Sequence, residues 1–85
     1  MKQQLVQFYF DLINSIKECE EKITEVELDI ERLGTHKNNA IDPALHTHYQ
    51  VLLFGKIHTR NALIEKKEIY ETISDKINSI LTLQK

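Results

Sequence analysis

The chain has 85 residues, of which 41% are hydrophobic and 28% charged, and its formal net charge is −2. Eleven lysines and arginines against thirteen acidic residues leave no cationic excess, whereas a dedicated nucleic-acid-binding domain needs clustered cations. No hydrophobic run approaches the roughly 18 residues of a membrane span, and the N-terminal residues lack the pattern of a signal peptide. The composition therefore favours one small, soluble, cytoplasmic domain.

Residues 3–33 carry a continuous heptad pattern. Hydrophobic residues recur there at alternating steps of four and three over four heptads, which is typical of a helix packed along a second helix. Gly34 follows the last of them, where a C-terminal cap is common. We therefore predict a first helix over residues 3–33. Its seam consists of Leu5, Tyr9, Leu12, Ile16, Cys19, Ile23, Val26, Ile30 and Leu33.

Residues 34–42 are rich in turn-forming residues and predict a loop. Asp42 can cap a helix, and Pro43 at the first helical position loses no hydrogen bond. A second helix is therefore predicted over residues 43–81, although Gly55 and its polar neighbours interrupt the hydrophobic pattern. A short connection makes the two helices antiparallel. The predicted fold is all-α, a single hairpin domain over residues 1–85, with a short extra helical turn at the C-terminus as an alternative ending.

Charge favours pairing of the two helices. Residues 17–32 carry seven acidic and three basic side chains, whereas residues 43–70 carry four basic and two acidic ones. In the simplest antiparallel register Glu18 lies near Arg60, so the acidic face of one helix meets the basic face of the other. Exposed pairs of this kind contribute little stability but help to select the facing surfaces.

The same register predicts an uncovered end. Leu33 beside Leu45 places Leu5 beside Ile73, so residues 76–85 project beyond the first helix. This projection would leave a hydrophobic patch exposed at one end of the hairpin, and exposed hydrophobic patches usually mark contact surfaces. In the alternative, residues 76–85 fold back as a third short helix. The predicted partner-binding residues are Phe8, Phe10, Ile77, Ile80, Leu81 and Leu83.

Chemical sites receive no support from the residue pattern. His46 and His48 are two residues apart and point to different faces of a helix, so they do not converge on a zinc ion. Cys19 falls on the seam, where a cysteine behaves as a small hydrophobic residue. Phosphate-binding and nucleophile motifs do not occur in the sequence. We therefore predict no catalytic residue, no cofactor and no metal, and a chain that is not an enzyme.

The second predicted helix starts with Asp42-Pro43-Ala44-Leu45, then Tyr49-Gln50, and continues as a long amphipathic helix. This start resembles small helical-hairpin proteins of bacterial type III secretion systems. The resemblance extends over about residues 42–80 and involves two families. One is the needle co-chaperone family (YscE-, PscE- and SsaE-like). The other is the needle subunit, in which a later Arg-Asn-Ala sequence corresponds to residues 60–62.

The complete seam of the first helix favours the co-chaperone family, because needle subunits usually begin with a loosely ordered polar segment. The resemblance implies a non-enzymatic cytoplasmic protein that binds a tetratricopeptide-type chaperone and helps to keep the needle subunit soluble and unpolymerised. It also leaves room for weak self-association. Two alternatives stay open: a self-assembling needle subunit, and an unrelated coiled-coil adaptor or homodimer in which two hairpins form a four-helix bundle.

Overall fold

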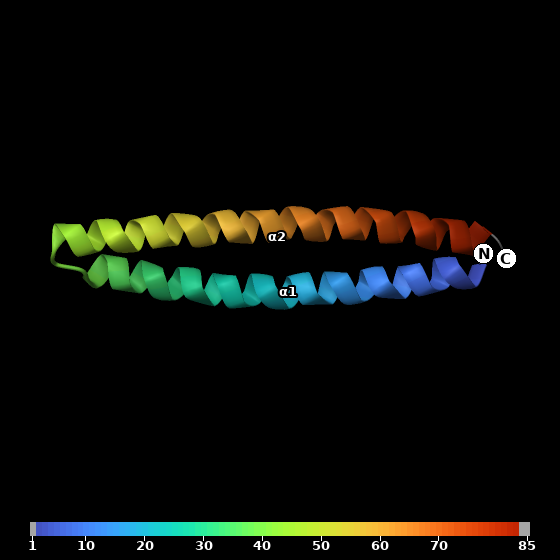
Figure 1. Cartoon of the computed structure of the whole chain (residues 1–85), viewed down its shortest axis with the longest axis horizontal. Coiled ribbons are helices and arrows are strands. Elements are labelled where there is room, and N and C mark those ends of the chain that lie inside the picture. The colour runs from blue at the N-terminus through green and yellow to red at the C-terminus, as the bar shows by residue number, and fades with distance from the viewer. Residues whose placement is uncertain (1, 84–85) are drawn as a thin grey trace.

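The chain folds into two long helices that lie side by side. The computed structural model describes residues 2–83, with α1 over Lys2–Asn39 and α2 over Pro43–Leu83. The helices are antiparallel, and both ends of the chain lie at the same end of the molecule (Figure 1). The predicted all-α antiparallel hairpin is thus confirmed.

The hairpin is a thin rod. Its principal extents are 64 × 14 × 14 Å, and its radius of gyration is 19.0 Å, against about 12 Å for a compact domain of this length. The accessible surface is 6539 Å², about 1,300 Å² more than the ~5,200 Å² of a globular protein of the same mass. Two helices alone therefore leave more surface in contact with water than a globular fold does, and twelve large hydrophobic side chains of the described residues are exposed.

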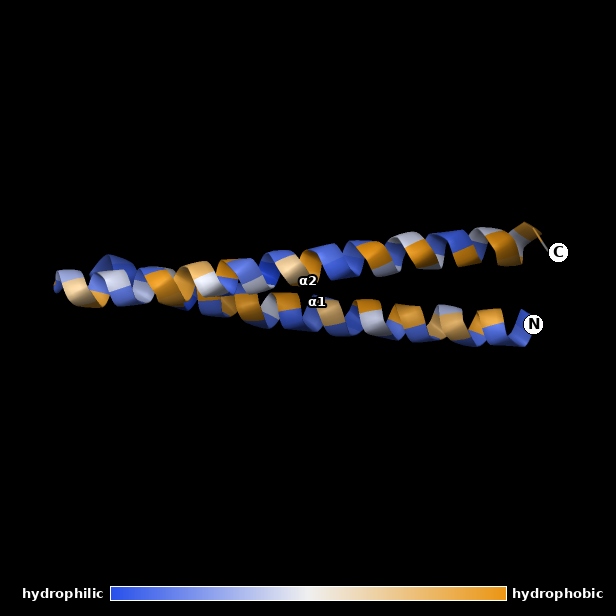
Figure 2. Cartoon of the chain, turned by 45° about the horizontal axis from the view of Figure 1, so that its top comes forward, coloured by the Kyte–Doolittle hydropathy of each residue, from blue (hydrophilic) through white to orange (hydrophobic). Residues whose placement is uncertain are grey.

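The predicted seam of α1 faces α2 along its whole length. Each of its nine residues is buried or half-buried, and the three most buried residues of α1 are Leu12, Cys19 and Val26. In Figure 2 the hydrophobic residues of α1 gather on the side toward α2. Repetition every three or four residues places them on one stripe of the helix, and burying that stripe holds the hairpin together.

Helix α1 does not end at Gly34, as the sequence predicted, but continues to Asn39. No residue from 2 to 83 has a positive φ, so Gly34 adopts ordinary helical geometry instead of a left-handed cap. A glycine inside a helix costs only about 1 kcal/mol. The additional turn offsets this cost because Lys37 continues the seam, half-buried, and the His36 ring stacks on Tyr49 with 5.5 Å between centroids.

Helix α2 begins where the sequence predicted. The backbone N–H of Ala44 donates to Asp42 Oδ1 at 3.0 Å, and the N–H of His46 donates to the Asp42 carbonyl at 2.9 Å. Asp42 is therefore the N-cap, and Pro43 takes the first helical position. The connection shortens to residues 40–42, and α2 runs without a break to Leu83. Residues 76–83 therefore do not fold back as a separate short helix, so that alternative ending is wrong for them. Residues 84–85 of the predicted ending lie outside the described residues.

Contacts between the helices give their register. In each of three cross-helix pairs, the two residue numbers add up to 85 or 87, as expected for antiparallel neighbours. The pairs are Asp29 with Lys56, Glu20 with Lys67, and His36 with Tyr49.

This register differs by about two helical turns from the predicted one. Extended toward the termini, it places Leu5 at the level of residues 80–82, whereas the prediction placed it beside Ile73. Residues 76–83 therefore lie along α1, and the predicted overhang is wrong. The reason is the additional length of α1 after residue 33 and the shorter loop, which together move α2 along its partner.

Candidate functional site

The side of α2 that faces α1 is only partly hydrophobic. Its seam includes the half-buried cations Lys56, Arg60 and Lys67. Lys56 Nζ lies 3.2 Å from Asp29 Oδ2, and Lys67 Nζ lies 3.6 Å from Glu20 Oε1. These partly exposed ion pairs favour the observed register more than they add stability.

Arg60 lies at the level of residues 25–27, so its predicted place beside Glu18 is wrong. Its Nε is buried and has no hydrogen-bond partner among the described residues, while Nη2 lies 3.5 Å from Asn61 Oδ1. An unsatisfied buried donor costs about 1–3 kcal/mol. The α2 side of the contact between the helices is therefore less favourable than the α1 side, whose seam is almost entirely hydrophobic.

Two of the six predicted partner-binding residues are part of the interior. Ile77 is only 6% exposed and packs within the hairpin, and Leu81 is half-buried on the same inner seam. Their prediction as an exposed contact surface is wrong, because it depended on the overhang. In the observed register these residues lie at the level of the first three turns of α1.

Three other predicted residues are exposed at the open end of the rod. Phe8, Ile80 and Leu83 are 49%, 44% and 86% exposed. Phe8 directly precedes the seam residue Tyr9, and Ile80 directly precedes Leu81 on the inner side of α2. In an antiparallel pair of helices, residues at these positions lie on the same side of the contact. Asp29 and Leu52, which occupy equivalent positions, line one surface hollow between the helices. We call Phe8, Ile80 and Leu83 the terminal patch.

Phe10, the sixth predicted residue, is separate from that patch. It is exposed, and its ring lies edge-on to Tyr9 with 6.0 Å between centroids. Residues two apart on a helix are about 200° apart around its axis. Phe8 and Phe10 therefore flank the seam residue Tyr9 on opposite sides, and they cannot belong to one contact surface.

The largest hydrophobic feature is one that the sequence analysis did not identify. A second series with alternating steps of three and four runs along α2 beside its inner seam, and all twelve of its residues are exposed. Seven of the twelve are hydrophobic. We call this series the outer seam: Leu45, His48, Leu52, Gly55, Thr59, Ala62, Lys66, Ile69, Ile73, Lys76, Ile80 and Leu83.

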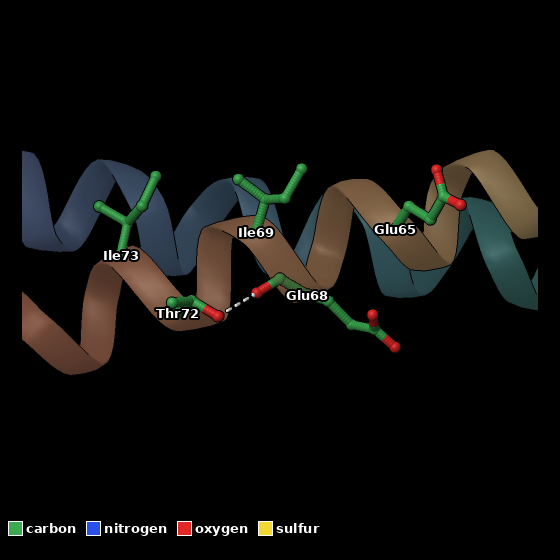
Figure 3. Close-up of a pocket in the computed structure, with 5 residues that line it drawn as sticks. All are labelled: Glu65, Glu68, Ile69, Thr72 and Ile73. Carbon is green, nitrogen blue, oxygen red and sulfur yellow. Dashed lines mark hydrogen bonds between the residues drawn. The ribbon is translucent and has the colours of Figure 1, made fainter.

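A shallow surface hollow lies on the outer seam. It is lined by Glu65, Glu68, Ile69, Thr72 and Ile73, and the isoleucines project side by side from α2 (Figure 3). Thr72 Oγ1 donates to the carbonyl of Glu68 at 2.9 Å. The hydroxyl is satisfied within its own helix, so the hollow offers mainly hydrophobic contact bordered by carboxylates.

The described residues offer little for chemistry. Within residues 2–83 no group of three or more His, Cys, Asp or Glu side chains is placed to hold a metal ion. The thiol of Cys19 is free and buried in the seam. Over the same residues, neither helix is long and hydrophobic enough to cross a membrane.

Comparisons with known proteins leave the family open. No protein-family model, no curated protein and no solved structure matches the chain. The resemblance to type III secretion proteins therefore remains a prediction.

Proposed function

We propose that this chain is a non-enzymatic co-chaperone of type III secretion. It binds a tetratricopeptide-type chaperone in the bacterial cytoplasm and helps to keep the needle subunit soluble and unpolymerised. The observation that carries the proposal is the terminal patch, where Phe8, Ile80 and Leu83 expose hydrophobic surface at the open end of a rod. Exposed hydrophobic clusters typically mark interaction sites.

The shape of the rod fits such a partner. Stacked helical repeats form extended concave surfaces, and a hydrophobic helix face is commonly recognised in a groove of this kind. The hairpin is 14 Å across, so its open end can enter a concave surface without unfolding. The predicted cap of α2 by Asp42 and Pro43, which carries the resemblance, is present.

The proposal is tested by mixing the purified chain with a tetratricopeptide chaperone and needle subunit from the same bacterium. We expect a discrete complex by size-exclusion chromatography with light scattering, and a melting temperature that rises with partner concentration. Needle subunit with both proteins should stay free of filaments longer than it does alone.

The variant Phe8→Asp/Leu83→Asp should lose the complex and keep its helicity by circular dichroism, because both side chains are exposed. Val51→Asp is the control, since the exposed fraction of Val51, 64%, lies between those of Phe8 and Leu83, and Val51 is distant from the open end. Equal binding by both variants would contradict the terminal patch as the contact. Filaments of the chain alone would support the needle-subunit alternative instead.

A further inference from the structure

We propose that the outer seam of α2 binds the outer seam of a second copy, forming an antiparallel homodimer with α2 against α2 at its centre. The proposal does not rest on the co-chaperone function, and the two contacts share only Ile80 and Leu83 of the outer seam. It starts from the exposure of all twelve outer-seam residues, because a helix with two hydrophobic seams needs two neighbours and the hairpin supplies only one.

The shape of the outer seam suits a partner helix better than a small ligand. Its twelve positions follow steps of three and four from Leu45 to Leu83, and the seven hydrophobic residues among them lie on one stripe of the helix. A stripe of this length suits contact with a second helix. A groove for a small ligand would need converging walls, whereas the hollow around Ile69 and Ile73 lies open on one helix surface (Figure 3).

The identity of the second helix follows from the distribution of side-chain size along the seam. Large hydrophobic residues occupy its two ends, and the small residues Gly55, Thr59 and Ala62 lie between them. In an antiparallel pair with Leu45 opposite Leu83, Gly55 lies opposite Ile73 and Thr59 opposite Ile69. At these two inner pairs an isoleucine meets a small residue, as close packing favours.

A two-fold axis makes each of these contacts occur twice, which is the condition for a closed dimer. Gly55 is compatible with the arrangement, because within the hairpin the space beside its Cα is open and leaves room for Ile73 of the other copy. The two lysines of the seam can extend their charged ends past the edge of the contact into water.

The contact area is sufficient for a dimer of moderate affinity. From Leu45 to Leu83 the seam is about 57 Å long at ~1.5 Å per residue. A strip about 10–12 Å wide then buries roughly 1,100–1,400 Å² in total, near the lower end of specific interfaces. On each copy this removes about half of the ~1,300 Å² by which the hairpin exceeds a globular protein.

The first experiment measures self-association of the full chain by sedimentation equilibrium between about 1 μM and 1 mM. We expect a monomer–dimer equilibrium with no larger species. In the proposed register Ala62 lies opposite Lys66 of the other copy. Ala62→Lys should therefore raise the dissociation constant at least tenfold by like-charge repulsion, whereas Ala62→Glu should bind as tightly as the natural chain or more tightly.

Asn61→Lys is the matched control, because it adds the same charge one residue away on the opposite flank of α2, where Asn61 is exposed. This variant should dimerise normally. All three variants should keep the helicity of the natural chain, since Ala62 and Asn61 are both exposed. A strictly monomeric natural chain, or equal effects of Ala62→Lys and Asn61→Lys, would overturn the proposal.

The second experiment tests the register by disulfide cross-linking in a Cys19→Ala background. Chains with Gly55→Cys mixed with chains with Ile73→Cys should give a cross-linked dimer, because the two positions face each other. Neither variant alone should do so, since each position is then about 27 Å from its own copy along the axis. Cross-linking of Gly55→Cys with itself would indicate parallel pairing and overturn the proposed arrangement.

Discussion

The two helices of this hairpin differ in how they use their surfaces. Helix α1 has one hydrophobic seam, buries it against α2, and leaves three large hydrophobic side chains exposed, whereas α2 leaves eight. The side of α2 that packs against this seam contains three half-buried cations. The hairpin thus buries most of the hydrophobic surface of α1 but leaves much of the hydrophobic surface of α2 exposed. We therefore expect partners to bind chiefly through α2.

The largest effect should separate the inner and outer faces of α2. Ile77→Asp places a carboxylate at a position that is only 6% exposed, and should destabilise the hairpin by about 3–5 kcal/mol. Ile80→Asp changes an exposed residue and should stay within about 0.5 kcal/mol at concentrations where the chain is monomeric. Urea unfolding followed by circular dichroism measures both. Similar midpoints would mean that the inner seam is not the interior.

On α1, the difference in stability loss between a buried and an exposed substitution should be nearly as large. Leu12 is 5% exposed in the seam, and Leu28 is 54% exposed on the opposite surface. Leu12→Ala should cost about 2–5 kcal/mol through lost burial and the cavity left behind. Leu28→Ala should cost less than about 0.5 kcal/mol. A comparable loss from both would show that α1 has a second buried face.

Arg60 should be a residue whose replacement stabilises the contact between the helices. Arg60→Leu removes the buried Nε that has no partner among the described residues, and should stabilise the chain by about 1–3 kcal/mol. The control is Arg32→Leu, since the Arg32 side chain is largely exposed and should change stability by no more than about 0.5 kcal/mol. Thermal unfolding compares the two, and a destabilised Arg60→Leu would indicate a partner for the guanidinium.

The smallest effect compares the two glycines. Neither Gly34 nor Gly55 has an atom within 4 Å of a built side chain, and both have ordinary helical geometry. Substitution by alanine should stabilise the monomer by about 0.5–1 kcal/mol at each position. As the concentration rises into the dimer range, only the Gly55→Ala gain should shrink, because Gly55 faces Ile73 of the other copy. Melting temperatures at two concentrations measure this difference.

Local signals accounted for most of the fold. The seam of α1 was predicted residue by residue, because burial on one face of a helix requires that spacing. The start of α2 was also predicted, because Asp42 and Pro43 determine a helix N-terminus through their own hydrogen bonding and geometry. Both features depend on residues close together in the sequence.

The candidate site was predicted only in part. Phe8, Ile80 and Leu83 are exposed as expected, but Ile77 and Leu81 lie inside. The outer seam was missed although its spacing is present in the sequence. Its residues were counted together with those of the inner seam as one irregular hydrophobic pattern, and only the position of α1 separates the two series.

The sequence by itself therefore determined the two helices, the seam of α1 and the cap of α2. Tertiary structure alone decided the register, and with it which hydrophobic residues of α2 face inward. The physical reason is that the end of α1 depends on contacts made across the loop. The stacking of His36 on Tyr49 and the half-burial of Lys37 extend α1 past Gly34. Each added turn shifts the pairing of every later residue.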